Sequence, residues 1–358
     1  MDPVSHAALG RTLISAVTST PRPARAAAVA AVLGSLSPDL DFILMPFGWD
    51  IYLRAHEIGT HSIIGSLCCA LLTAAVVRLF ARSAPYRELA AAAWVGAASH
   101  VALDLVSSAR LRVAWPVLDA VVSLPLVAMA DPWLLTLSIA GPIAIWMVRW
   151  NRRTRTANVS GVGRPGGERR AARLVLAAIA LFLTGKAALG MIAISKYERA
   201  RQSAGRPVFA RVIEAQWASV AAWHVFDRTP DALRAWRASA GGAVEKTFEW
   251  PLEKETPPIT ASRGLTTVKN FLRAHELGFA ISGEQPENRV AVMWSDIRFC
   301  WTPDATGALP IGTAVRSGPG MMPIACALWF GGELGRDGTP LRQIVRIGSL
   351  TQTRAPAR

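Results

Sequence analysis

Histidine and aspartate residues gather in the first third of the chain, within segments that are otherwise strongly apolar. They are His6, Asp39, Asp41, His56, His61, His100 and Asp104. Ionisable side chains beside long apolar runs are costly, and they usually persist because they do chemistry or move ions. Imidazole and carboxylate groups together, with no thiolate among them, are typical ligands of hydrolytic divalent-metal sites. The set therefore predicts a divalent-metal site.

His100 and Asp104 are spaced i and i+4. On a helix this spacing places an imidazole and a carboxylate on one face, near enough to bind one ion or each other. A metal site and a hydrogen bond that only serves helix packing are therefore the two interpretations of this pair. Its apolar surroundings favour function, because ionisable residues inside a membrane are usually functional.

Asp39 and Asp41 follow Pro38 just beyond a predicted helix end. In an extended segment, residues two apart point the same way, so we expect both carboxylates to face one site. Two like charges this close raise each other's pKa unless a cation lies between them. For an isolated pair of this kind, a solvated turn is the alternative. Here the two aspartates lie at one end of the predicted bundle, and this position favours the metal site.

The segment from His56 to His61 carries two histidines and one acid, Glu57. It is not the HExxH zinc-protease signature, because its histidines are five residues apart and a helix would separate them by about 140°. We expect His56 in a loop and His61 at the first turn of a membrane span, with Thr60 or Ser62 as the cap. Glu57 is either a base or an outer partner of the site, or else an ordinary solvated loop acid.

Long apolar runs predict a membrane-embedded helical bundle. A span needs about 20 apolar residues, and residues 61–80, 89–106 and 171–195 supply such runs. Residues 117–148 are too long for one span, and Pro125, Asp131 and Pro132 divide them. This division predicts a short interfacial or re-entrant helix over 117–130 and a span over 133–148, with Asp131 as its N-terminal cap. Two weaker helices are expected over 5–18 and 24–36, the second ending before Pro38.

Arginine residues mark one end of this bundle. Arg22 and Arg25 lie at one end of the first helix pair, Arg78, Arg82 and Arg87 lie between the next two spans, and a dense cluster follows over 149–173. If these turns are cytoplasmic under the positive-inside rule, the histidines and aspartates meet at the opposite end. The formal charge of +14 is thus explained by membrane topology better than by nucleic-acid binding, because the arginine cluster lies between two apolar runs.

The chain changes character from about residue 197 onward, where charges, glycine and proline become frequent. Alternating segments predict strands over 244–250, 289–301, 324–330 and 343–347, and a short helix over 266–274 capped by Thr266 or Thr267. Asp296 and Arg298 are expected to form an ion pair. Cys300 and Cys326 lie on two predicted strands. An extracytoplasmic location of this region would allow a disulfide between them, but the sequence does not decide whether they pair.

In order along the chain, the motifs resemble those of the YdjM-like membrane-bound metal-dependent hydrolases. These motifs are His6, Pro38-Asp39-x-Asp41, His56-x-x-x-Thr60-His61-Ser62, His100-x-x-x-Asp104 and Trp115-Pro116. The resemblance covers residues 1–150, and the segment around Asp296 to Phe299 looks like a tail domain found in many members. The family looks related to zinc-dependent phospholipases C and single-strand nucleases, which implies phosphodiester hydrolysis by fold-level analogy. Where the family usually has arginine after the His56 position, this chain has Glu57.

We expect an α-helical membrane bundle of about four to six membrane-associated helices, followed by a small extracytoplasmic α+β domain. The expected divisions are a metal-site domain over 1–150, a basic cytoplasmic linker over 151–170, a transmembrane helix over 171–195 and the outer domain over 196–358. The protein would be integral to a bacterial inner membrane, with the site on the outer face. No cleavable signal peptide is evident.

The expected function is metal-dependent hydrolysis of a phosphoester or related ester at the membrane surface. The predicted ligands are His6, Asp39, Asp41, His61, His100 and Asp104. Zinc is favoured, with manganese or iron as alternatives, and the ion would lower the pKa of a water molecule. His56 or Glu57 would orient that water or protonate the leaving group. The partners would be the bilayer and a lipid or phosphate-containing substrate, with no specific nucleic acid. The rival hypothesis is a transporter or metal-sensing scaffold that uses the same groups.

Overall fold

The computed structural model of the chain describes residues 1–18, 25–56, 58–156, 166–203, 205, 207–301, 325–347 and 350–355. Two compact units share these residues. The first comprises Met1–Phe42, Ala55–Gly190 and Ala215–Val220, and the second comprises Ile43–Arg54, Met191–Glu214 and Ala221–Arg358. Each unit has its own core and is considered by itself.

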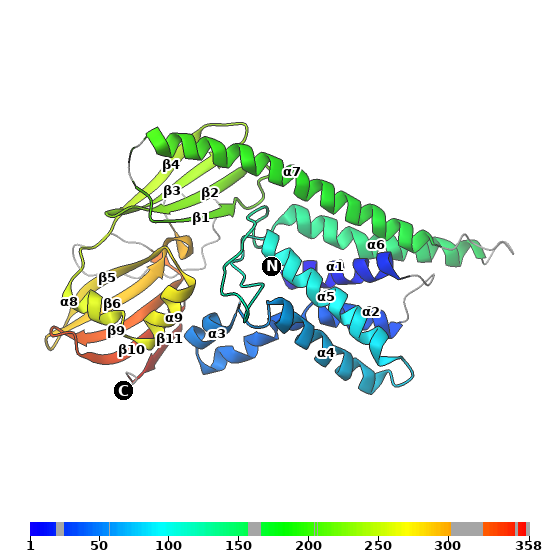
Figure 1. Cartoon of the computed structure of the whole chain (residues 1–358), viewed down its shortest axis with the longest axis horizontal. Helices are drawn as coiled ribbons and strands as arrows, with labels where there is room; N and C mark the ends of the chain where they lie inside the picture. Colours follow the sequence, from blue (N-terminus) through cyan, green and yellow to red (C-terminus); the bar gives the residue numbers. More distant parts are fainter. Residues whose placement is uncertain are drawn as a thin grey trace. The chain divides into compact units, whose positions relative to one another are not determined.

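The first unit is helical (Figure 1). Its helices are α1 (Pro3–Val17), α2 (Arg25–Gly34), the 3-10 helix η1 (Ser37–Phe47), α4 (Ile63–Phe80), α5 (Tyr86–Val106), α6 (Pro132–Thr156) and α7 (Gly167–Ser203). The last residues of η1 and of α7 belong to the second unit. In the described part of the chain, four helices are long and apolar enough to cross a membrane, namely α4, α5, residues 132–151 of α6, and α7. The predicted spans over 61–80, 89–106, 133–148 and 171–195 are therefore confirmed as apolar helices. A fifth span is formed if α2 and η1, which meet at a 45° bend, count as one.

Helix α5 lies at the centre of the first unit, where it packs on α1, α2 and α4. Small residues allow the helices to come very close. A Cβ added at Gly96 of α5 would meet the Ala31 carbonyl oxygen at 2.0 Å, and one added at Gly34 of α2 would meet the Ala93 carbonyl oxygen at 2.2 Å. Glycine is thus required at this crossing, as is common where membrane helices pack backbone to backbone.

The helix predicted over residues 117–130 is wrong. Leu111 and Val122 instead exchange backbone hydrogen bonds of 3.0 and 2.8 Å, and the segment folds back as an irregular loop. Apolar composition suggested a helix, but Pro125 lacks an N–H and β-branched valines favour extended backbone. The Ile63 N–H donates to the Val113 carbonyl, 2.9 Å away, and so ties this loop to the start of α4. Asp131 caps α6 as predicted, with its Oδ1 accepting from the N–H groups of Trp133 and Leu134.

The extended conformation predicted around Asp39 and Asp41 is also wrong, because both residues lie in η1. In a helix of three residues per turn, side chains two apart point in different directions rather than the same one. The two carboxylates therefore do not share one face. The different directions of the two side chains determine which side of the histidine cluster each carboxylate contacts.

The second unit is rich in β-sheet. Besides α3 (Trp49–Ala55), it contains β1 (Ala210–Ala215), β2 (Ala222–Arg228), β3 (Ala232–Ser239), β4 (Val244–Pro251), α8 (Pro257–Ser262), α9 (Thr266–Ala274), β5 (Gly278–Gln285), β6 (Arg289–Asp296), η2 (Ile297–Phe299), β7 (Cys300–Trp301), β8 (Ala325–Cys326), β9 (Leu328–Gly335), β10 (Pro340–Ile347) and β11 (Leu350–Arg354). Within the described ranges, one sheet has the order β1-β2-β3-β4 and another β11-β10-β9-β6-β5. Helices α8 and α9 pack on the second sheet.

Most local predictions for this unit are confirmed. Helix α9 has the predicted bounds, although its N-cap is Leu265 rather than a threonine; Gln343 Oε1 accepts from the Thr267 N–H instead, at 3.0 Å. The carboxylate of Asp296 pairs with Arg298 at 2.8 Å. Cys300 and Cys326, directly opposite each other on β7 and β8, form a disulfide.

Candidate metal centre

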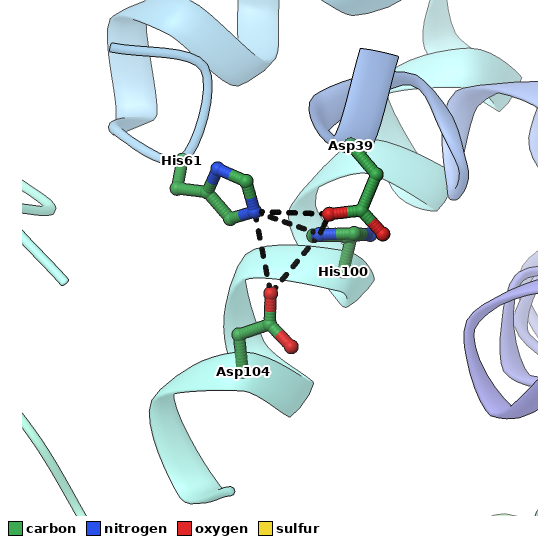
Figure 2. Close-up of side chains that lie close together, drawn as sticks. All are labelled: Asp39, His61, His100 and Asp104. Carbon is green, nitrogen blue, oxygen red and sulfur yellow. Dashed lines mark hydrogen bonds and ion pairs between the residues drawn. The ribbon is translucent and has the colours of Figure 1, made fainter. Parts of the chain in front are cut away.

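Four of the predicted ligands converge in the first unit, and Figure 2 shows their side chains pointing at one another. Asp39 comes from η1, His61 from the turn before α4, and His100 and Asp104 from successive turns of α5. One ligand atom from each lies within 4.8 Å of all the others. Both imidazoles and Asp104 are buried, whereas the Asp39 side chain is 20% exposed. The i, i+4 spacing thus places His100 and Asp104 on one face, as expected.

The separations within this group fit a single ion. His100 Nε2 lies 3.0 Å from Asp104 Oδ2 and 3.5 Å from Asp39 Oδ1. His61 Nε2 lies 3.4 Å from each of the same two oxygens. Donors that bind one zinc ion at about 2.0–2.2 Å in a tetrahedral arrangement lie roughly 3.3–3.6 Å apart. The four residues could therefore hold a metal ion with little rearrangement.

The ring orientation of His100 is fixed by the backbone just after α2. Its Nδ1 lies 2.8 Å from the carbonyl oxygen of Ser35. A carbonyl can only accept, so Nδ1 carries the proton and Nε2 presents its lone pair to the site. This contact depends on the close approach of α2 and α5, because Gly96 lies against the backbone of both Ala31 and Ser35.

The ring of His61 is fixed by a hydroxyl and a carboxylate. Its Nδ1 lies 3.0 Å from Thr60 Oγ1, and that hydroxyl donates to Asp41 Oδ2 at 3.1 Å. Since the hydroxyl proton is used toward Asp41, Thr60 accepts from the Nδ1–H of His61. The Nε2 lone pair of His61 is then also directed into the site, in the manner of metal-ligating histidines whose other nitrogen donates to an outer partner.

The two Nε2 atoms lie 3.1 Å apart. Two lone pairs that face each other at this distance, in a buried site, repel unless a cation lies between them. A cation held between the two nitrogens would remove this repulsion.

His6 lies beside this group rather than within it. Its ring stacks on His100 with centroids 3.8 Å apart, and its Nε2 is 3.3 Å from Asp104 Oδ1, the oxygen on the far side of that carboxylate. The amino group of Met1 lies 2.5 Å from the same oxygen. Among the described residues, His6 Nδ1 is buried without a hydrogen-bond partner. Asp2 caps α1 by accepting from the N–H and hydroxyl of Ser5, which sets His6 in the first turns of that helix.

The first 197 residues of the chain match the family model described as YdjM inner membrane protein. The chain belongs to this family. It is also similar to the uncharacterized protein YfhP of Bacillus subtilis (strain 168), with 30% identity over 152 residues. That match covers 41% of this chain and 46% of YfhP, so the chain matches less than half the length of this relative. No solved structure matches the chain.

Membership of the YdjM family confirms the resemblance that the motifs indicated. Together with the apolar helices, it makes this chain an integral membrane protein associated with the lipid bilayer. The matched region contains all seven of the histidines and aspartates singled out from the sequence. The second unit lies mostly beyond residue 197, so most of it is outside the matched region.

The remaining predicted residues of this YdjM-family protein surround His61. Asp41, His56 and His61 form a second group of ligand atoms within 4.8 Å of one another. His56 Nδ1 lies 3.0 Å from Asp41 Oδ2, and Asp41 Oδ2 lies 4.0 Å from His61 Nδ1. Asp41 therefore meets the protonated side of His61, opposite the face that Asp39 contacts. Glu57 lies outside the described residues.

Two groups that position the site could not be assigned from the sequence. Thr60 was expected only as a helix cap, but Ser62 is the cap of α4, accepting from the Gly65 N–H at 3.0 Å. The Ser35 carbonyl is a backbone group, and it carries no signature in the sequence. The glycines at the crossing of α2 and α5 are the one signal that could have indicated a close helix approach next to His100.

Proposed function

We propose that this YdjM-family protein is a metal-dependent hydrolase that cleaves a phosphoester or related ester at the membrane surface. The observation that carries the proposal is the pair of buried Nε2 lone pairs, 3.1 Å apart, closed by two carboxylates. Such a donor set binds a divalent cation, and nitrogen with oxygen ligands favours zinc, with manganese or iron as alternatives. When bound, the ion supplies Lewis-acid chemistry and lowers the pKa of a coordinated water.

Asp39, His61, His100 and Asp104 are the residues that would hold the ion. Asp39 is the most exposed of them, at 20% of its side chain against 0–5% for the other three. A substrate would therefore approach from the side of Asp39. His6, stacked on His100 and close to the second oxygen of Asp104, would hold that carboxylate or complete the ligand set.

His56 is the residue best placed to move a proton. Its Nδ1 contacts Asp41 at 3.0 Å and its side chain is 22% exposed, so its ring is oriented by a buried carboxylate and reaches the edge of the site. A histidine held in this way can protonate a leaving group or orient a water molecule. Asp41 would act through His56 and His61 rather than on the substrate.

The depth of the site supports surface chemistry. At 1.5 Å per residue along α5, His100 and Asp104 lie about 20 and 26 Å from Arg87 at the arginine-rich end of the bundle. The hydrocarbon layer is about 30 Å thick. The site would then lie near the opposite boundary, within reach of headgroups, whereas the substrate site of a transporter is expected near the middle.

Two features support an outer location for the site and the second unit. The arginine-rich turns are expected to be cytoplasmic, which directs the site outward. The Cys300–Cys326 disulfide is a bond that persists in oxidising compartments. The proposed location is the inner membrane, with the site and the second unit outside, where a lipid or another phosphate-containing compound is the proposed substrate.

A substrate screen tests the proposed activity. Phosphodiester, phosphomonoester and carboxylester substrates would be offered to the detergent-purified wild type and to Asp39→Asn, with and without added zinc. Turnover that requires metal and is lost in the variant is expected. No turnover of any ester class, together with metal-dependent ion flux in liposomes, would favour the transporter instead.

A further inference from the structure

A basic cavity lies at the opposite end of α1 from the metal centre. It has a volume of about 260 Å³ and is lined by Gly166, Arg169, Arg170, Arg173 and Leu174, which lie just before α7 and in its first turns. Helix α1 reaches this cavity with Ala16 near its C-terminus. At 1.5 Å per residue, Ala16 lies about 15 Å along α1 from His6. The cavity is thus separate from the metal centre.

Two of the three arginines are held in place by one carbonyl. Arg169 Nε and Arg173 Nε each donate to the Ala16 oxygen at 3.3 Å. This oxygen is one of the last carbonyls of α1, which have no partner within the helix. The contacts use one of the five N–H donors of each guanidinium, so the terminal NH₂ groups remain to bind something else.

The three arginines make the cavity strongly basic. In the described part of the chain, no carboxylate pairs with Arg169, Arg170 or Arg173, and the neighbouring Glu168 pairs with Arg149 at 2.8 Å. Arg169 and Arg173 are one helical turn apart, and like charges at this spacing destabilise a helix. A bound anion would remove this repulsion.

We propose that the cavity binds the phosphate group of an anionic lipid headgroup. Guanidinium pairs recognise phosphate through parallel hydrogen bonds, and basic pockets beside membrane helices are known to suit anionic headgroups. Leu174, which lines the cavity, is 63% exposed, and it begins the apolar surface of α7 where an acyl chain would lie. The site would fix the arginine-rich end of the bundle to its leaflet. This proposal is independent of the proposed hydrolase activity.

The test compares lipid binding by full-length protein in an uncharged detergent. Native mass spectrometry would measure binding of phosphatidylglycerol and of phosphatidylcholine with the same acyl chains. We expect phosphatidylglycerol to bind more tightly. Arg169→Gln with Arg173→Gln should weaken its binding at least about tenfold, because the variant loses hydrogen bonds to a charged group. The matched control is Arg82→Gln with Arg87→Gln, which removes equal charge from exposed positions at the same end and should change binding less than about twofold.

A second pair of variants separates specific recognition from charge and from misfolding. Arg169→Lys with Arg173→Lys keeps the charge and loses the forked donors, so it should also weaken binding while the protein elutes and melts as wild type does. Inorganic phosphate is added as a competitor: displacement of the lipid assigns the site to free phosphate as well, and its failure assigns it to the headgroup. Equal losses in both glutamine pairs, or equal binding of the two lipids, would overturn the proposal.

Discussion

The hydroxyl of Thr60 should control how tightly the metal binds, although it is not a proposed ligand. It accepts from His61 Nδ1 at 3.0 Å and donates to Asp41 Oδ2 at 3.1 Å. Thr60→Val keeps the shape of the side chain and removes both hydrogen bonds. The Nδ1–H of His61, on a side chain only 1% exposed, then loses its acceptor.

The magnitude follows from that loss. A buried donor left without a partner costs about 1–3 kcal/mol, which corresponds to a factor of roughly 5 to 150 in a binding constant. Loss of outer partners of ligating histidines weakens metal binding by about 10–100-fold, in the same range. We therefore expect Thr60→Val to bind zinc at least about tenfold more weakly than wild type.

The assay is a competitive zinc titration against a chromophoric chelator, with the protein in detergent. Thr60→Ser is the matched control, because it keeps the hydroxyl and loses only a methyl group; its affinity should stay within about threefold of wild type. If Thr60→Val and Thr60→Ser bind zinc equally well, the orientation of His61 does not depend on this hydroxyl and the reasoning is refuted.

Three further predictions concern the packing, the second unit and the topology. Gly96→Ala places a Cβ 2.0 Å from the Ala31 carbonyl oxygen, so it should destabilise the protein by about 1–3 kcal/mol and weaken zinc binding. Gly185→Ala is the control, because a Cβ there meets nothing within 4 Å. It should change neither the melting temperature nor the zinc affinity in the same experiments. Burial raises the pKa of Asp296, but Arg298 and His275 outweigh it and hold that pKa well below its ordinary range. The stability that this carboxylate contributes is present above about pH 4 and is lost as the pH falls below it. Urea unfolding followed by tryptophan fluorescence should therefore show a free energy of unfolding that falls in acid, and Asp296→Asn should lack this fall. A cysteine placed at Ser239 should react with an impermeant label from outside intact cells, and labelling only from the cytoplasmic side would reverse the proposed orientation.

The membrane helices could be predicted because their length and apolar composition are properties of single segments. Residues 117–130 show the limit of that approach. Their composition is as apolar as that of a helix, yet Val122 pairs with Leu111 and the segment forms a loop. Only the tertiary contact of this loop with the start of α4, through Val113 and Ile63, distinguishes the two outcomes.

The residues of the candidate site could be named from the sequence, but their geometry could not. Asp39 and Asp41 were expected to share one face, and the 3-10 conformation of η1 instead sends them to opposite sides of His61. Thr60 and the Ser35 carbonyl take their roles from contacts with Asp41 and His100, which are distant from them in sequence. The contact of Ser35 depends on how closely α2 and α5 approach each other, which no single segment determines.

The central claim is that His61 and His100, with their Nε2 atoms 3.1 Å apart, bind a divalent metal ion together with Asp39 and Asp104. The most direct test is the metal content of the detergent-purified protein, measured by inductively coupled plasma mass spectrometry for wild type and His100→Ala prepared side by side. Near-stoichiometric zinc, manganese or iron in wild type and its sharp loss in the variant are expected. Equal metal content in the two proteins would contradict the claim.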